Sequence, residues 1–278
     1  MKPRIEFAAA THTGLRRENN QDFWLIEEKA GLFAVADGMG GHEAGGLAAR
    51  IAIDATRQFV LGAARETSAS SPDAILRGAV QAAHRSITAE SKRLRQERPM
   101  GTTLVAALLT GDQAVVASVG DSRAYLIRAR SHQRLTRDHR VVEEYADLGI
   151  IPRRDVASHP LRNMLSRSLG GPRDVEPDLT RLTLAPGDRL LLCSDGLSEM
   201  LDDLELVRRV REGKAPERAA ELLIEGALGG GGLDNVTVVI VARPRSGAPR
   251  PRGAQRGDPE ATVTAGPRTL HRALAPAV

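Results

Sequence analysis

Five aspartates that share one local context are the residues of this chain best suited to chemistry. Four of them follow apolar runs and stand beside a glycine or an asparagine, and the fifth closes the polar stretch Asn19–Asp22; they are Asp37, Asp121, Asp195, Asp234 and Asp22. Any one alone would be interpreted as a turn residue, because aspartate tolerates left-handed backbone and bonds its own main chain. Together, at strand ends, they predict an acidic cluster. Carboxylate, carbonyl and water oxygens suit Mg²⁺ or Mn²⁺.

Composition excludes several classes of protein. Of the 278 residues 41% are hydrophobic, enough for a substantial core, and no apolar run is long enough for a membrane helix. The formal charge of +4 comes from residues 244–278, where six arginines face two acids, so nucleic-acid binding is not indicated. The single cysteine, Cys193, lies in an apolar run and excludes an intrachain disulfide. With no apolar segment at the N-terminus, a cytoplasmic location is expected.

The elements that must position the aspartates can be read from the apolar spacing. Helical spacing predicts helices over 43–64, 73–97, 198–210 and 216–226, and apolar runs predict two or three strands in 5–37 and further strands over 102–109, 113–119, 122–128, 188–193 and 235–242. Directly joined hairpins indicate antiparallel sheets. We therefore expect an α+β fold, a four-layer α-β-β-α sandwich with two antiparallel sheets flanked by helices. Residues 1–243 form the expected catalytic domain, and the Pro/Arg/Gly-rich residues 244–278 an expected disordered tail.

Eight segments in a fixed order carry a family resemblance. They are Thr11–Asp22, Asp37–His42, Gly101–Thr103, Gly120–Arg123, Leu135–His139, Leu165–Gly170, Ser194–Gly196 and Asp234-Asn235. The chain resembles the metal-dependent serine/threonine protein phosphatases of the type 2C (PPM) family, in their compact bacterial form. The resemblance covers residues 5–242. It implies hydrolysis of phosphoserine and phosphothreonine by in-line attack of a water that bridges two metal ions.

The resemblance also implies a role for each matching residue. Asp37 bridges two Mn²⁺ or Mg²⁺ ions, Asp195 and Asp234 complete one shell, and the Gly38 carbonyl serves the other, with Asp22 acting mostly through water. Asp121 and Asp195 match positions that hold a third, weaker ion. Arg17 matches the arginine that grips the substrate phosphate, and His42 matches a histidine near the leaving group. The implied protein is a monomer that acts on phosphorylated proteins, namely a bacterial Ser/Thr kinase and its substrates.

Several alternatives stay open at this stage. A relative that has lost catalysis and serves as a regulatory binding module is the other reading of the family pattern. Arg17 could be a solvated surface charge, and His42 a turn residue that caps the following helix. Two departures from the pattern concern the metals: Gly46 stands where relatives often carry glutamate, and the glycines of 229–232 predict a loop of high conformational entropy before Asp234. The segment 138–168 resembles the variable flap that shapes substrate access.

Overall fold

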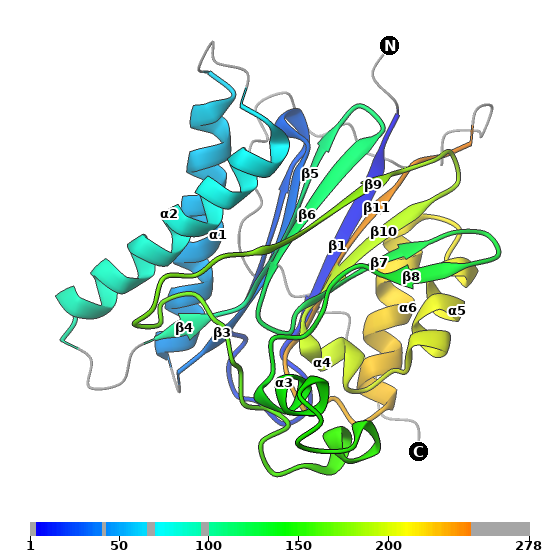
Figure 1. The fold of residues 1–278 in the computed structure, drawn as a ribbon. Helices are drawn as coiled ribbons and strands as arrows, with labels where there is room; N and C mark the ends of the chain where they lie inside the picture. The colour runs from blue at the N-terminus through cyan, green and yellow to red at the C-terminus, as the bar shows by residue number, and fades with distance from the viewer. Residues whose placement is uncertain (1–3, 41–42, 66–69, 96–99, 246–278) are drawn as a thin grey trace.

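Two antiparallel sheets lie face to face at the centre of the computed structural model, which describes residues 4–40, 43–65, 70–95 and 100–245 (Figure 1). One sheet has the order β1 (Glu6–His12), β11 (Val236–Ala242), β10 (Arg189–Cys193), β7 (Arg123–Ile127), β8 (His132–Arg134). The other has the order β2 (Asp22–Glu27), β3 (Leu32–Met39), β5 (Leu104–Thr110), β6 (Gln113–Val119), β9 (Asp178–Thr183), and β4 (Gly101–Thr102) pairs with the end of β3.

Helices cover the outer face of each sheet (Figure 1). The sheet of β3 packs against α1 (Glu43–Ala63) and α2 (Pro72–Arg93), and the sheet of β11 against α4 (Asp195–Ser198), α5 (Asp203–Glu212) and α6 (Pro216–Gly229). Three short pieces complete the fold: η1 (Glu28–Ala30), α3 (Val141–Asp147) and η2 (Arg153–Ser158). The four-layer α-β-β-α sandwich expected from the sequence is confirmed. No helix in the described part of the chain is long and apolar enough to cross a membrane.

Alternate side chains of the central strands enter different cores. In β11, Val238 and Ile240 pack toward the helices, whereas Val239 and Val241 pack between the two sheets. Successive strand residues point to opposite faces, so a strand covered on both faces needs apolar residues throughout. This is why the central strands read as continuous apolar runs. Cys193 in β10 is fully buried, and burial raises the pKa of its thiol to about 12, as fits a small core residue.

Some element predictions were wrong at edges and ends. The helix expected over 198–210 begins only at Asp203, because Asp202 caps α5 by accepting a hydrogen bond of 2.8 Å from the Glu205 amide, and Ser198 ends the separate helix α4. The helix expected over 73–97 ends at Arg93. Strands β8 and β9 were not predicted: they are edge strands with exposed or half-buried polar residues, so their sequences lack apolar alternation. Residues 246–278, which hold nearly all of the expected tail, lie outside the described residues.

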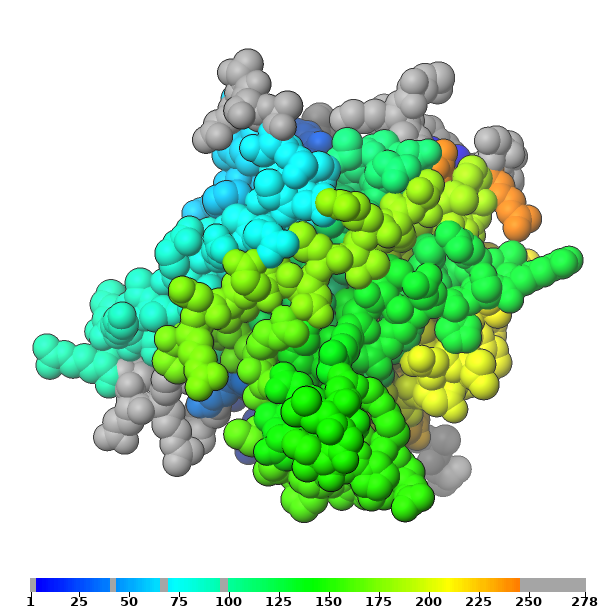
Figure 2. All heavy atoms as spheres, in the orientation of Figure 1, coloured from blue at the N-terminus to red at the C-terminus, as the bar shows by residue number. Residues whose placement is uncertain are grey.

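Residues 138–168 form a lobe at one end of the molecule, as expected for a flap with short helical pieces (Figures 1 and 2). Its two ends are tied together at its base. The Val141 amide donates to the Met164 carbonyl at 2.9 Å, and the Ser166 amide donates to the His139 carbonyl at 2.8 Å. The two ends of the lobe are therefore held together at its base, next to Asp138 and His139.

Candidate metal centre

Asp22 and Asp37 face each other across neighbouring strands. Asp22 begins β2 and stands directly opposite Asp37 of β3 in the antiparallel register. Side chains opposite each other in such a pair are about 4.5–5.5 Å apart at Cβ, and like charges there are destabilising. Asp22 is 1% exposed; its Oδ2 accepts a 2.7 Å hydrogen bond from the Ser194 hydroxyl, while its buried Oδ1 has no partner. A cation between these two carboxylates would relieve both the repulsion and the unpaired oxygen.

The Gly101–Thr103 segment holds the backbone of Asp37. The Asp37 carbonyl accepts hydrogen bonds from the Thr102 hydroxyl at 2.8 Å and the Thr103 amide at 2.9 Å, and the Asp37 amide donates to the Thr103 hydroxyl at 3.0 Å. The Thr103 hydroxyl also lies 2.7 Å from that of Ser122, next to Asp121. Two segments far apart in the sequence are thus joined behind the acidic cluster.

Close backbone packing explains the glycine that follows Asp37. A Cβ at Gly38 would lie 2.1 Å from the Gly45 carbonyl oxygen, because the first turn of α1 runs directly over the end of β3. Only glycine permits this approach. Gly46, the departure noted above, is different: a Cβ there would meet its nearest neighbour, the Gln21 Cα, at an ordinary 3.7 Å. His42, the histidine expected near the leaving group, lies outside the described residues.

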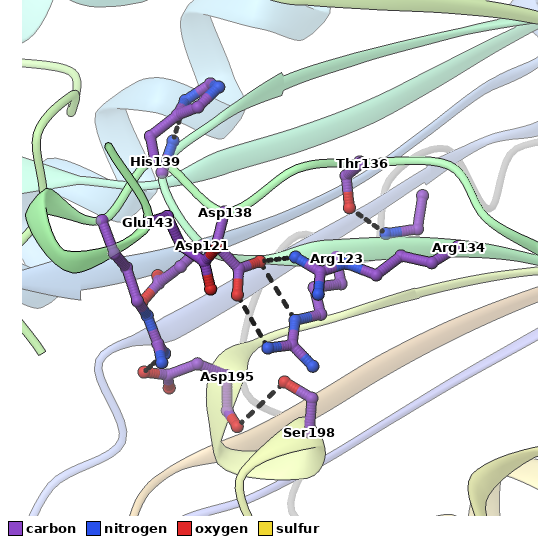
Figure 3. Close-up of polar contacts among 12 residues, drawn as sticks. Asp121, Arg123, Arg134, Thr136, Asp138, His139, Glu143, Asp195 and Ser198 are labelled. Carbon is purple, nitrogen blue, oxygen red and sulfur yellow. Dashed lines mark hydrogen bonds and ion pairs between the residues drawn. The ribbon is translucent and has the colours of Figure 1, made fainter. Parts of the chain in front are cut away.

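Asp121 and Asp195 share one arginine that sequence reasoning missed. Asp121 follows β6, and Asp195 is the first residue of α4. Arg140 donates from Nε to Asp121 Oδ2 at 2.7 Å, and its Nη2 lies 3.5 Å from Asp195 Oδ2 and 3.1 Å from Glu199 Oε1. Arg140 directly follows the segment Leu135–His139, but no spacing in the sequence indicates where its side chain reaches. Figure 3 shows Asp121 and Asp138 close together, with Asp195 on α4 below them.

Asp234 is positioned by its neighbour Asn235 and is paired with Arg17. The Asn235 side chain accepts from the Gln21 amide at 2.8 Å and donates to the carbonyls of Thr13 and Asn19 at 2.8 and 3.0 Å. It therefore fastens the N-terminal loop to the loop before β11. Arg17 lies on that N-terminal loop, and its Nη2 donates to Asp234 Oδ2 at 2.6 Å, although the two residues are 217 positions apart. Arg17 is 55% exposed, so its guanidinium faces both the cluster and solvent.

The glycines before Asp234 end a helix. Helix α6 continues to Gly229, Gly230 is its C-cap, and Gly231 and Gly232 have φ of 125° and 52°. The Gly232 amide donates to the Ala227 carbonyl at 3.0 Å, which satisfies one of the last helical carbonyls. The prediction of a high-entropy loop over 229–232 is thus wrong for Gly229 and Gly230, which form the end and the C-cap of α6. Gly231 and Gly232 take the left-handed backbone that terminates the helix.

Electrostatic repulsion marks these aspartates as one group. Burial raises the pKa of Asp37 well above its ordinary value, and the neighbouring charges of Asp22, Asp195, Asp121 and Asp234 raise it further. Burial also raises the pKa of Asp195 strongly, with Asp121 and Glu199 next in effect. Burial raises the pKa of Asp22 to about 6, against the effect of the Ser194 hydrogen bond. Each of these carboxylates is therefore affected by the negative charge of its neighbours in the group.

Two further motifs form a polar layer behind Asp121. Arg123 makes a bidentate pair with Asp138, at 3.0 and 2.7 Å, and Arg134 adds a second ion pair to the same carboxylate (Figure 3). His139 Nδ1 accepts from the Gly120 amide at 3.1 Å, and the His139 amide donates to the Gly120 carbonyl at 2.9 Å. These contacts join the segment Gly120–Arg123 to the segment Leu135–His139. They therefore also fix the turn that carries Asp121.

The donor set fits hard divalent cations in its chemistry. The five aspartates and the Gly38 carbonyl supply only oxygen, and Asp22 has a buried oxygen without a partner. Within the described residues, no three His, Cys, Asp or Glu side chains converge closely enough to form a ready ligand set. In the structure Arg17 pairs with Asp234, and Arg140 pairs with Asp121.

The sequence is similar to those of known protein phosphatases over most of its length. A family model described as protein phosphatase 2C matches residues 11–221. Serine/threonine protein phosphatase PstP of Mycobacterium tuberculosis is 39% identical over 240 residues, which cover 85% of this chain and 44% of that protein. Serine/threonine phosphatase stp of Listeria monocytogenes is 35% identical over 235 residues, which cover 82% of this chain and 92% of that protein. The match therefore spans less than half of PstP and nearly all of stp.

Solved structures agree with the observed architecture. The Mycobacterium tuberculosis phosphatase PstP/Ppp superimposes with a TM-score of 0.78 at 37% identity, over 87% of this chain and 99% of that chain. A catalytic domain of PstP in complex with two manganese ions superimposes with a TM-score of 0.75 at 36% identity, over 86% of this chain and 97% of that chain. At 36–37% identity, these solved structures resemble the chain in sequence as well as in fold.

Proposed function

The chain belongs to the protein phosphatase 2C family, and we propose that it is a metal-dependent phosphatase that hydrolyses phosphoserine and phosphothreonine in proteins. The observation that supports this proposal most directly is the cross-strand pair of Asp22 and Asp37. Two carboxylates directly opposite each other, one half-buried and one buried with an oxygen that has no partner, are costly unless a cation joins them. Relatives at 35–39% identity are named serine/threonine phosphatases, which supports a phosphatase reaction at this cluster.

Five groups are proposed as ligands of two Mn²⁺ or Mg²⁺ ions: the side chains of Asp22, Asp37, Asp195 and Asp234 and the Gly38 carbonyl. Asp121 lies at the edge of the group, at the position that the family resemblance assigns to a third, weaker ion. Such ions, when bound, supply a nucleophilic water at neutral pH and neutralise charge on the phosphoryl oxygens. The chain itself contributes rigid placement: Asp37 is fixed by Thr102 and Thr103, and Asp234 by Asn235.

Arg17 can leave Asp234 and turn toward the substrate phosphate when a metal ion binds. In the structure it pairs with Asp234, and this hydrogen bond is the main cause of its raised pKa. Metal binding to Asp234 would withdraw that carboxylate's negative charge, and the exposed guanidinium would then be free to turn toward solvent. Its planar fork can donate to two phosphoryl oxygens at once, which lysine cannot do. We infer that Arg17 is the group that holds the substrate phosphate.

The cellular setting of the reaction is a proposal as well. Reversal of phosphorylation by a bacterial Ser/Thr kinase fits an enzyme that acts on phosphoproteins. A chain with a single, fully buried cysteine suits a reducing compartment, so we propose the cytoplasm. We also propose that residues 1–243 contain the whole catalytic unit, because β11 ends at Ala242 and the Arg243 side chain returns to the Leu184 carbonyl at 2.6 Å.

The test compares wild-type protein with Asp37→Asn and a matched control, Asp112→Asn. Asp112 lies in the exposed β5–β6 turn, at the other end of β6 from Asp121. Each protein is stripped with EDTA, and hydrolysis of a phosphothreonine peptide is followed with and without Mn²⁺. Wild type and Asp112→Asn should be active only with Mn²⁺, and Asp37→Asn should be inactive although folded. Hydrolysis by stripped protein, or activity of Asp37→Asn within tenfold of wild type, would refute the proposal. Inactive wild type with Mn²⁺ would favour the silent regulatory module.

A further inference from the structure

Arg140 joins three acidic side chains from two separate segments, the turn after β6 and helix α4 with its C-cap. Its Nε lies 2.7 Å from Asp121 Oδ2, and its Nη2 lies 3.1 Å from Glu199 Oε1 and 3.5 Å from Asp195 Oδ2. The Arg140 side chain is only 12% exposed, and Asp121 is 4% exposed. This guanidinium is therefore enclosed among carboxylates rather than spread on the surface.

The backbone of Arg140 keeps the side chain in this place. Arg140 is the N-cap of α3, and its carbonyl accepts from the Glu143 amide at 3.0 Å. It also forms an isolated antiparallel bridge with Leu165 on the returning strand of the flap. Both ends of the flap base thus hold the residue against the acidic cluster. An arginine anchored in this way gives up little further freedom when it forms its ion pairs.

A divalent cation between Asp121 and Asp195 would compete with Arg140 for these two carboxylates. Mg²⁺ binds carboxylate oxygens at about 2.0–2.1 Å and loses its water reluctantly. A guanidinium is more weakly hydrated, and its fork matches carboxylates, so it competes well at a buried position. Asp121 Oδ2 already accepts from Nε at a short distance, and the Arg140 charge is balanced by Asp121, Asp195 and Glu199 together.

We propose that Arg140 is a built-in cation that occupies this corner of the centre in place of a third divalent ion. The chain then binds two exchangeable ions and keeps the Asp121 corner neutralised by its own side chain. This inference rests on the proposed function only in taking the remaining aspartates as the two-ion site. It also identifies Arg140 as a positioning residue, since it links the base of the flap directly to Asp195.

The test counts the Mn²⁺ ions that each protein binds. Isothermal titration calorimetry, with free Mn²⁺ followed by electron paramagnetic resonance, is applied to EDTA-stripped wild type, Arg140→Ala, Asp121→Asn and the double variant. The control is Arg137→Ala, an exposed arginine three positions away that pairs with Asp147 instead. Arg140→Ala should bind one Mn²⁺ more than wild type, weakly. The double variant should lose this additional ion, and Asp121→Asn and Arg137→Ala should bind as many ions as wild type.

Two results would overturn the proposal. One is an Arg140→Ala protein that folds but binds no more Mn²⁺ than wild type. The other is an Asp121→Asn protein, with Arg140 intact, that binds one ion fewer than wild type, since Asp121 would then already hold a metal. The second result decides the question even if Arg140→Ala fails to fold. Wild type that binds no Mn²⁺ would refute the two-ion site, whereas the difference between Arg140→Ala and wild type would still test the role of Arg140.

Discussion

Replacing Asp22 with asparagine should stabilise the metal-free protein while weakening its metal binding. Asp22 is buried at 1% exposure opposite Asp37, and its Oδ1 has no hydrogen-bond partner. Asparagine has nearly the same shape as aspartate, its side-chain oxygen can still accept from Ser194, and its amide group can donate toward Asp37. The substitution therefore removes a buried negative charge and preserves the packing around it.

The size of the effect follows from the pKa of Asp22. Burial raises this pKa from 3.8 to about 6 in the folded protein. A raised folded-state pKa means that the folded form binds the proton more tightly than the unfolded form. The associated stability is present below about pH 4 and is lost as the pH rises through about 6. Since each pKa unit corresponds to about 1.4 kcal/mol, the loss is about 3 kcal/mol. The asparagine of the variant does not titrate and avoids this loss.

The assay is chemical denaturation of EDTA-stripped protein from pH 4 to pH 8. The unfolding free energy of Asp22→Asn minus that of wild type should rise by about 2 to 3 kcal/mol across this range. Any constant offset from local contacts cancels in this comparison. The control is Asp188→Asn: Asp188 is buried but paired, accepting from the Ala185 amide at 3.0 Å and Arg128 at 3.2 Å, so its variant should be destabilised.

Added Mn²⁺ should reverse the order of stability. An ion that binds only the folded protein stabilises it in proportion to the logarithm of its affinity, and losing a ligand of the outer sphere typically costs about 10- to 100-fold in affinity. The thermal shift caused by Mn²⁺ should therefore be smaller for Asp22→Asn than for wild type. A free-energy difference that stays constant or falls from pH 4 to pH 8 would refute the buried-charge argument. An unchanged Mn²⁺ shift would remove Asp22 from the metal site.

Three further predictions concern the phosphate, the metal and the tail. Arg17→Ala should keep its Mn²⁺ affinity by calorimetry but lose roughly 10²- to 10³-fold in kcat/KM, as expected for an oriented donor to phosphoryl charge; lost Mn²⁺ binding would make Arg17 structural. Gly46→Glu should tighten Mn²⁺ binding by about 10- to 100-fold in calorimetry, because a side chain fits there and restores an outer carboxylate; clearly weaker binding would contradict this. A chain ending at Arg243 should hydrolyse a small aryl phosphate as fast as the full-length protein, and unfolding of that shorter chain would place residues after 243 inside the fold.

Much of the fold could be predicted from the sequence because buried elements have a regular pattern of apolar residues. Central strands such as β6 and β11 are apolar along their length, since both faces are covered, and their bounds were predicted within one residue. Strands β8 and β9 lie at sheet edges, where one side needs no partner and polar residues are tolerated. Their sequences therefore contain little that distinguishes them from loops. The break between α4 and α5 depends on one cap at Asp202, which a helical pattern does not reveal.

The same division holds for the candidate site. The sequence by itself determined which residues have the right chemistry, because an aspartate at the end of a buried strand must lie where the strands of its sheet end. Only the tertiary structure decided the partners: Arg17 with Asp234, Arg140 with Asp121, and the unpaired oxygen of Asp22. Strand ends are local features of the chain, whereas ion pairs join residues brought together by the register of the sheets and the path of the flap. An arginine's long side chain reaches several ångströms in any direction, so its target becomes known only when the backbone around it is in place.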